Sequence, residues 1–392
     1  MRDLNGPMRH VSDRERRSRL AVRHALAPAF AAASPEAATR AMTVLHATEP
    51  ASVYLSCWAR VASLQVADVD RALYEERSLV KQLAMRRTLF VFPPDLLPAV
   101  WSSASARVAG TERARMAKDV EKAGLSEDGN AWIDQARHAV LGLLADEPDG
   151  RPAAEIRQAI PMIDVKIAGV VGGGASPASR VLTLLGASAD IVRGTNTGGW
   201  HTSRPRWTRM QDWLDEVPAS LDPADGYREL VRRWLHTFGP GTEDDIVWWL
   251  GSTKTVVRAA LAALDAEAVS LDHGETGWLL PDDVDEVPDA GPWAALLPVL
   301  DPTVMGWRSR DFYLGPHRDR LFDRTGNAGT TAWVNGRVVG CWVQDDAARV
   351  QLTLLEQVTP AEQRLLDAEA TRLTAWLDGF RLGTVYRSPA MR

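Results

Sequence analysis

The residues Leu45-His46-Ala47-Thr48-Glu49-Pro50 separate two segments with helical patterning, and the run Met85-Arg86-Arg87-Thr88-Leu89-Phe90-Val91-Phe92 follows about forty residues later. The first stretch joins a polar triplet to the start of a helix. The second is an apolar, strand-like run with arginines at its head. Because helices followed by a two-stranded ribbon are the plan of a winged helix, these two stretches together predict a helix-turn-helix with a wing.

Helix-start signals surround the first stretch on both sides. At Ser34-Pro35-Glu36 a capping serine precedes a proline at the first helical position. The expected elements of this group are helices from Ser12, from Ser34 to about Leu45, after Pro50 and from Val66 to Glu75, closed by a hairpin over residues 79–92. We therefore expect a first winged-helix unit over residues 12–93.

The same order of helices and ribbon recurs twice further along the chain. A second ribbon is expected from Ala189 to about Trp207, and a third over residues 268–280. Each ribbon follows a short helix that begins at a glycine, serine or threonine signal. The expected domains are winged helices over residues 12–93, 94–215 and 222–283, and a C-terminal domain over residues 291–392.

The C-terminal part differs from these groups because it is rich in strand signals. An acidic, proline-bounded linker over residues 281–289 precedes strand-like runs at 296–302, 331–340 and 350–354. Asn335-Gly336 is a type I′ hairpin signal. A final helix is expected from Pro360 to Leu377.

Composition limits the classes of function. With 24% charged residues and a net charge of −6, broad charge-driven coating of nucleic acid or membrane is excluded, so any DNA site must be local. The only two cysteines, Cys57 and Cys341, imply neither a disulfide framework nor a zinc cluster. No apolar run approaches the length that crosses a bilayer, and we expect a cytoplasmic protein without cofactor or metal.

Three segments carry a resemblance to a known family: residues Met85 to Leu89, the stretch Asp245-Ile246-Val247-Trp248-Trp249-Leu250-Gly251, and residues 301–315, which begin Asp301-Pro302-Thr303-Val304. With them, nearly the whole chain resembles the winged-helix DNA-binding family that includes the AlkZ/YcaQ-like DNA interstrand-crosslink glycosylases. The resemblance implies an α+β fold of three tandem winged helices and a C-terminal β-barrel-like domain, arranged as a C-shaped cradle for double-stranded DNA. It also implies excision of bulky N7-alkylated purines and unhooking of crosslinks, with a hairpin of the barrel probing the minor groove.

The family's Gln-apolar-Gln or Gln-apolar-Asp catalytic motif falls on His46-Ala47-Thr48 in this chain. The resemblance therefore implies His46 and Thr48 as catalytic residues, with a histidine and a threonine in place of the family's polar residues. His46 could orient or deprotonate water, Thr48 could make one hydrogen bond, and Glu49 could supply negative charge. The structural alternatives are a helix-end histidine satisfied by backbone and a Thr48 that caps the following helix.

Candidate DNA-binding side chains are Arg86 and Arg87 in the first wing, Arg204 and Arg206 in the second, and His317, Arg318 and Arg320 in the loop after Tyr313. Solvated wings and an ordinary surface loop are the alternatives. The Gly172-Gly173-Gly174 stretch could seat a phosphate or form a flexible turn before a helix at Pro177.

Two other functions stay open beside a glycosylase. One is a non-catalytic winged-helix protein that acts as a regulator or lesion sensor. The other is a cradle that has lost DNA binding and serves a small molecule or a protein. We expect a monomer, because three winged helices in one chain could surround DNA without a partner.

Overall fold

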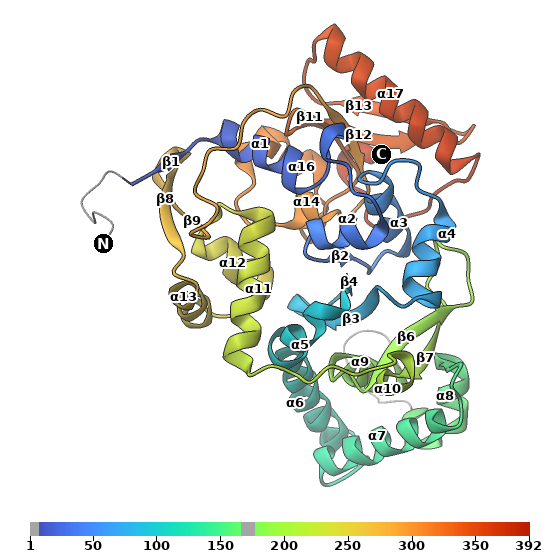
Figure 1. Cartoon of the computed structure of the whole chain (residues 1–392). Coiled ribbons are helices and arrows are strands. Elements are labelled where there is room, and N and C mark those ends of the chain that lie inside the picture. Colours follow the sequence, from blue (N-terminus) through green and yellow to red (C-terminus); the bar gives the residue numbers. More distant parts are fainter. Residues whose placement is uncertain (1–7, 166–176) are drawn as a thin grey trace. The chain divides into compact units, whose positions relative to one another are not determined.

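The structure is a computed structural model that describes residues 8–165 and 177–392. The chain divides into two compact units, one formed by Met1–Val69 with Arg228–Arg392 and the other by Asp70–Tyr227. Helices and strands mix in each unit, which confirms the predicted α+β class (Figure 1). The triple-glycine stretch at residues 172–174 lies outside the described residues.

The helices of the first unit begin where the sequence places polar capping residues. Ser12 Oγ accepts the Glu15 N–H, and Thr242 with Asp245 forms a capping box in which each side chain accepts from the other's backbone. The helices are α1 (Asp13–Arg23), α2 (Pro35–Ala41), α3 (Pro50–Trp58), α4 (Val66–Asp70), α11 (Pro223–Phe238), α12 (Glu243–Leu250), α13 (Lys254–Ala263), α14 (Pro302–Met305), α15 (Asp311–Leu314), α16 (Arg318–Leu321) and α17 (Pro360–Leu377). The prediction of a last helix from Pro360 to Leu377 is confirmed.

Helix α2 starts as expected but ends early. Ser34 caps it and Pro35 occupies its first turn, whereas the helix stops at Ala41 rather than near Leu45. Thr43 has a φ of 63°, a left-handed conformation that a helix cannot contain. The chain then forms the short strand β2 (Leu45–His46), so the polar triplet begins on a strand and does not follow a helix.

The three predicted ribbons are all present as antiparallel hairpins. They are β3 (Val80–Ala84) with β4 (Thr88–Phe92), β6 (Ile191–Asn196) with β7 (Pro205–Arg209), and β8 (Glu267–Leu271) with β9 (Thr276–Leu279). The division of the chain places the first two hairpins in the second unit and the third hairpin in the first unit.

The second unit is built mainly from helices around an apolar core. Its helices are α5 (Leu97–Val100), α6 (Ala106–Lys122), α7 (Gly129–Ala145), α8 (Ala153–Ala159), α9 (Pro177–Ala187) and α10 (Met210–Trp213), and the short strand β5 (Arg151–Pro152) pairs with β7. Trp132 and Ile133 of α7 and Leu185 of α9 are among the buried residues of this core. Apolar side chains recurring at helical spacing explain this burial.

The C-terminal part of the first unit is an open sheet, and the prediction of a β-barrel-like domain is wrong. The strands β10 (Ala294–Leu297), β11 (Thr331–Val334), β12 (Arg337–Gln344) and β13 (Val350–Leu354) pair in that order, all antiparallel. Asn335 and Gly336 both have positive φ and join β11 to β12, which confirms the type I′ hairpin signal. Four short strands are too few to close a barrel, and α17 packs against β10, β11 and β13.

A cluster of aromatic rings forms much of the core of the first unit. Phe238 of α11 lies edge-on to Trp307, with ring centroids 5.1 Å apart, and Tyr313 stacks on Trp333 at the same distance. The indole N–H of Trp307 donates to the Phe238 carbonyl at 3.1 Å, so the buried polar atom is satisfied. This cluster ties the third helix group to the segment between β10 and β11.

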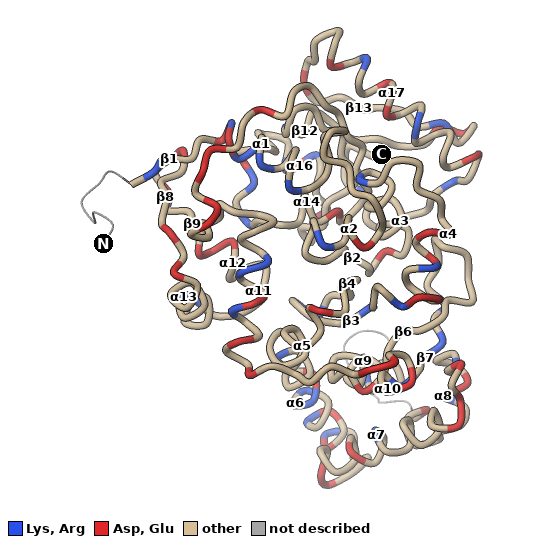
Figure 2. Tube along the Cα trace, viewed as in Figure 1, with Lys and Arg blue, Asp and Glu red and all other residues tan. Residues whose placement is uncertain are grey.

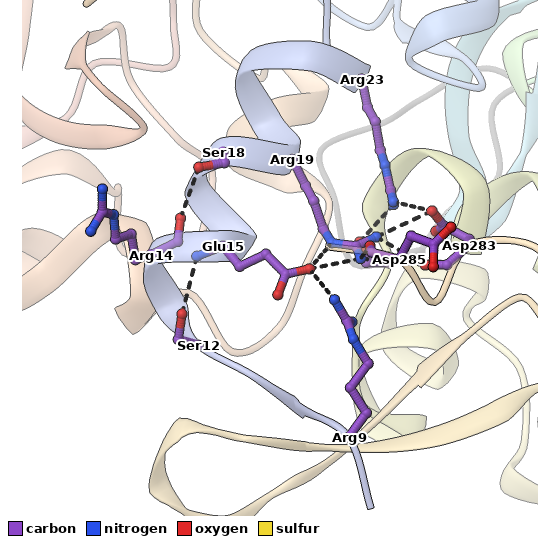
Figure 3. Close-up of polar contacts among 10 residues, drawn as sticks. Arg9, Ser12, Arg14, Glu15, Ser18, Arg19, Arg23, Asp283 and Asp285 are labelled. Carbon is purple, nitrogen blue, oxygen red and sulfur yellow. Dashed lines mark hydrogen bonds and ion pairs between the residues drawn. The ribbon is translucent and has the colours of Figure 1, made fainter. Parts of the chain in front are cut away.

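The acidic linker at residues 281–289 is held by the arginines of α1. Arg19, which is 2% exposed, donates to Glu15, to the Asp283 carboxylate at 3.2 Å and to the Asp285 carbonyl at 2.8 Å (Figure 3). Arg23 also binds Asp283, and Arg9 binds Glu15 at 2.8 Å. Arg19 and Arg23 of α1 therefore already bind acidic and carbonyl groups within the protein.

Candidate active site

Helix α3 is buried on all sides and is fixed to the segment at residues 298–303 by polar contacts. Ser52 Oγ donates to the Val299 carbonyl at 2.7 Å, and Ser56 Oγ donates to Asp301 Oδ2 at 2.6 Å. Arg60 donates two hydrogen bonds to Asp301, at 2.9 and 2.8 Å, and neither side chain has measurable exposure. Helix α3, which the polar triplet precedes, is thus anchored along its length.

The ionised state of Asp301 is stabilised within this anchor. Burial alone would raise the pKa of Asp301, but the Arg60 guanidinium and hydrogen bonds from Ser56 and the Thr303 N–H bring the pKa below its ordinary value. Arg60 also donates to Thr303 Oγ1 at 2.8 Å. The anchor is therefore a charged pair with its hydrogen bonds formed.

His46 lies on β2 with 7% of its surface exposed. Its Nδ1 accepts the backbone N–H of Thr48 at 3.4 Å, so in the neutral ring the proton is on Nε2. The alternative of a histidine at a helix end is wrong, because His46 lies on a strand. The expected contact with the backbone is present, since Nδ1 accepts the Thr48 N–H. His46 holds the turn that leads into α3.

Thr48 is exposed, and its interpretation as the helix cap is wrong. The N-cap position belongs to Glu49, which has extended backbone (φ −97°, ψ 112°) and makes no capping contact with its side chain. Pro50 at the first helical position needs no hydrogen bond from a cap. The Thr48 hydroxyl is therefore not needed to start α3.

Glu49 turns away from its own helix toward the C-terminal tail. Its Oε2 accepts the Thr384 hydroxyl at 3.2 Å, and among the described residues no cation lies within ion-pair distance of it. Burial raises the pKa of Glu49, and the hydrogen bond from Thr384 opposes this shift only in part. A partly buried carboxylate without a positive partner is a candidate functional group when it lines a cavity.

Glu49 lines a cavity of about 200 Å³ inside the first unit. Its walls come from α3, from residues 298–299, from β12 and from the tail, and include Ser52, Leu55, Val299, Thr330, Trp342, Gln344, Arg381, Thr384, Arg387 and Met391. Gln344 holds the tail in place, because its side chain donates to the Phe380 carbonyl at 2.8 Å and accepts the Leu382 N–H at 2.9 Å. No local sequence pattern could predict this wall, since residues 49 and 384 are 335 positions apart.

A second hollow, of about 930 Å³, adjoins the first through Arg387, which lines both. Arg318, Arg324 and Arg392 also line the larger hollow, and Arg320 lies on the same short helix, α16. All five arginines are exposed, and within the described ranges no hydrogen bond or ion pair engages their guanidinium groups. We call these five residues the arginine cluster. Of them, sequence analysis named only Arg318 and Arg320.

The other predicted DNA-binding residues differ in their exposure and in whether their side chains already have partners. Arg87 is about half exposed and pairs with Glu112 at 3.2 Å, while Arg86 has the left-handed φ of 55° and is partly buried. Arg204 is exposed, whereas the Arg206 guanidinium donates to the carbonyls of Asp149 and Gly150. His317 lies 3.2 Å from Glu356 and is only partly exposed.

The loop after Tyr313 consists of helical turns rather than a hairpin. Residues 315–321 form two short turns, and Asp323 then accepts from Thr325 and Asn327 to close a tight loop. Basic and acidic residues are interspersed along the trace of both units (Figure 2). In residues 8–165 and 177–392, no cluster of three or more His, Cys, Asp or Glu side chains could hold a metal ion, and no helix is long and apolar enough to span a membrane.

Comparison with known proteins places this site in a family. The model of the family described as DNA glycosylase AlkZ-like matches residues 39–376. The chain belongs to the AlkZ-like DNA glycosylase family. The match includes the His46-Ala47-Thr48 triplet, α3 and the whole sheet, whereas Thr384 and Arg387 lie beyond it.

The fold agrees with this AlkZ-like assignment. The solved structure of Streptomyces sahachiroi DNA glycosylase AlkZ matches with a TM-score of 0.72 and 19% identity, over 93% of this chain and 97% of that chain. No curated protein matches the sequence. The family assignment implies DNA glycosylase activity, DNA repair and DNA as the partner.

Proposed function

We propose that this protein is a monofunctional DNA glycosylase that hydrolyses the N-glycosidic bond of bulky N7-alkylated purines, including crosslinked ones, in double-stranded DNA. The observation that carries the proposal is the family match over residues 39–376, which includes the polar triplet directly before the anchored helix α3. The N7-alkylated base is already cationic and leaves readily, so the enzyme needs little general acid. It needs a positioned water and stabilisation of the positive charge that develops on the sugar.

His46 and Thr48 supply hydrogen bonds in this proposal. In this proposal the imidazole of His46, whose Nδ1 accepts the Thr48 N–H, orients the attacking water. The exposed Thr48 hydroxyl can donate or accept a further bond. These groups can hold the attacking water on one side of the sugar.

We further propose that the three helix-and-hairpin groups act as winged helices that together cradle duplex DNA in a C shape. The contacts to phosphates are assigned to Arg86, Arg87, Arg204, Arg206, His317, Arg318 and Arg320. Support is strongest for Arg318 and Arg320, which are exposed and unengaged, and weakest for Arg206, which already binds two carbonyls. A monomer acting in the cytoplasm fits this proposal.

One observation favours a second candidate, a non-catalytic protein that binds DNA lesions. The triplet at the family's catalytic position holds histidine and threonine instead of two glutamines or a glutamine and an aspartate. Such a protein would keep the arginine cluster and bind duplex DNA without cleaving the glycosidic bond. The two candidates differ in products and not in binding.

The test is incubation with duplex DNA that contains a single N7-alkylguanine, followed by alkali to cleave abasic sites, with His46→Ala in parallel. We expect strand cleavage with the wild type and a loss of about 100-fold or more in the variant. Salt-sensitive binding of the same duplex by both proteins serves as the control. Binding without abasic product would support the second candidate and contradict the first.

A further inference from the structure

Glu49 is the residue beside the polar triplet that can supply a negative charge to the reaction. Hydrolysis of a glycosidic bond passes through a sugar with oxocarbenium-ion character, and a carboxylate is the usual group that stabilises it and handles the proton of water. Neither His46 nor Thr48 carries a negative charge. Glu49 follows them directly and is the acidic residue that lines the cavity.

We propose that Glu49 is the catalytic carboxylate of this enzyme, that Thr384 of the C-terminal tail is its positioning residue, and that the cavity they share receives the sugar of the modified nucleotide. This inference rests on the proposed function and names the group that carries out its chemistry. The Thr384 side chain restrains the carboxylate through the 3.2 Å hydrogen bond to Oε2, which leaves Oε1 free for a water. The volume of about 200 Å³ suits a single sugar-sized group.

The reaction balances with the groups present. Water attacks C1′ of the nucleotide while the C1′–N9 bond breaks, and the bonding electrons leave with the base. Since the N7-alkylated base was cationic, it departs neutral and needs no proton. Glu49 takes one proton of the water, so the products are the neutral base, an abasic sugar with a C1′ hydroxyl and a protonated Glu49, which then returns its proton to solvent.

The surroundings of Glu49 fit a base of this kind. The raised pKa makes the carboxylate a stronger base than an exposed glutamate. The charged groups that line the cavity from the tail are Arg381 and Arg387. Tyr386 of the tail interacts electrostatically with Glu49, and His46 lies three residues before Glu49 in the chain. Arg381 lies 3.6 Å from Asp346, while Arg387 has no acidic partner among the described residues and can bind a phosphate beside the reacting sugar.

The first experiment compares single-turnover base release by the wild type, Glu49→Gln and the control Glu369→Gln. Glutamine keeps the shape and can still accept from Thr384, so folding is preserved, whereas Glu369 is a carboxylate of α17 that pairs with Arg372 away from the cavity. We expect Glu49→Gln to lose about 100-fold or more in rate with unchanged affinity for duplex DNA, and Glu369→Gln to match the wild type. Thermal unfolding of each variant provides the folding control.

The second experiment tests Thr384 through the pH dependence of the rate. Because the hydrogen bond from Thr384 lowers the pKa of Glu49, its removal in Thr384→Val raises that pKa further, and the acid limb of the rate profile moves to higher pH. Thr384→Ser keeps the hydroxyl and should restore the wild-type profile. A merely structural role for Thr384 would lower the rate without moving the limb.

The outcomes separate the inference from the function on which it rests. An active wild type together with an equally active Glu49→Gln would overturn the inference and leave the glycosylase intact. A wild type that releases no base would overturn the proposed function and the inference with it. An acid limb that stays in place in Thr384→Val would overturn the role of Thr384 alone.

Discussion

The anchor between α3 and the segment at residues 298–303 predicts a large loss of stability when its charge balance is broken. In Asp301→Asn, the Arg60 guanidinium remains fully buried but loses the carboxylate that it contacts at 2.8 and 2.9 Å. Removing one partner of a buried ion pair leaves an uncompensated charge, which costs about 3–5 kcal/mol. Ser56 donates to Oδ2 and the Thr303 N–H donates to Oδ1, so the single amide oxygen of asparagine can keep only one of these hydrogen bonds, and the loss of the other adds to the cost.

Urea unfolding monitored by tryptophan fluorescence measures the effect, because Trp58 ends the anchored helix. The control is Asp346→Asn, whose exposed pair with Arg381 should contribute less than about 1 kcal/mol. Adding Arg60→Met to Asp301→Asn removes the unpaired charge, so the double variant should unfold at a higher urea concentration than Asp301→Asn alone. A loss below about 1 kcal/mol in Asp301→Asn, or a double variant less stable than Asp301→Asn, would show that the buried charge of Arg60 does not need its partner.

Three further predictions follow from single contacts. Arg387→Gln should weaken binding to duplex DNA and lower the salt slope by about 1, as measured by fluorescence anisotropy, whereas Arg349→Gln, on an exposed pair with Asp345, should leave both unchanged. Burial lowers the pKa of His24 to about 3. The His24 ring therefore stays neutral in the folded protein at pH values where the same ring binds a proton in the unfolded chain. The free energy of unfolding should therefore fall by about 2 kcal/mol between pH 6.5 and pH 5, and less in His24→Gln. Asp245→Ala should cost about 2–4 kcal/mol in urea unfolding, because the carboxylate caps α12 and also accepts the N–H groups of Arg308 and Ser309 at 2.8 Å; a loss below about 1 kcal/mol would contradict this.

Elements whose signals are local could be predicted from the sequence. The capping serine and proline at residues 34–35, the Asn335-Gly336 turn and the helix from Pro360 to Leu377 all lie where expected. Each depends on residues within one turn of each other. Helix α2 was predicted too long because the left-handed conformation of Thr43 has no signature in a threonine.

Features that depend on distant contacts could not be predicted. The barrel was wrong because strand-like runs do not reveal whether the two edge strands of a sheet meet. The arginines of α1 and Arg206 were candidates by composition, yet they bind carboxylates and carbonyls brought from elsewhere in the chain. The wall that faces Glu49 comes from the tail, whose residues have no pattern that points to a site.

The most direct test of the proposed function is to measure the free modified base that the wild-type protein releases from duplex DNA with a single N7-alkylguanine, with enzyme in excess and an enzyme-free sample to correct for spontaneous depurination. Mass spectrometry of the released base and of the strand reports both products. We expect release of the alkylated base above the enzyme-free rate, an intact strand with one abasic site, and no release of unmodified guanine. Tight, salt-sensitive binding of the duplex with base release no faster than in the enzyme-free sample would contradict the proposed function.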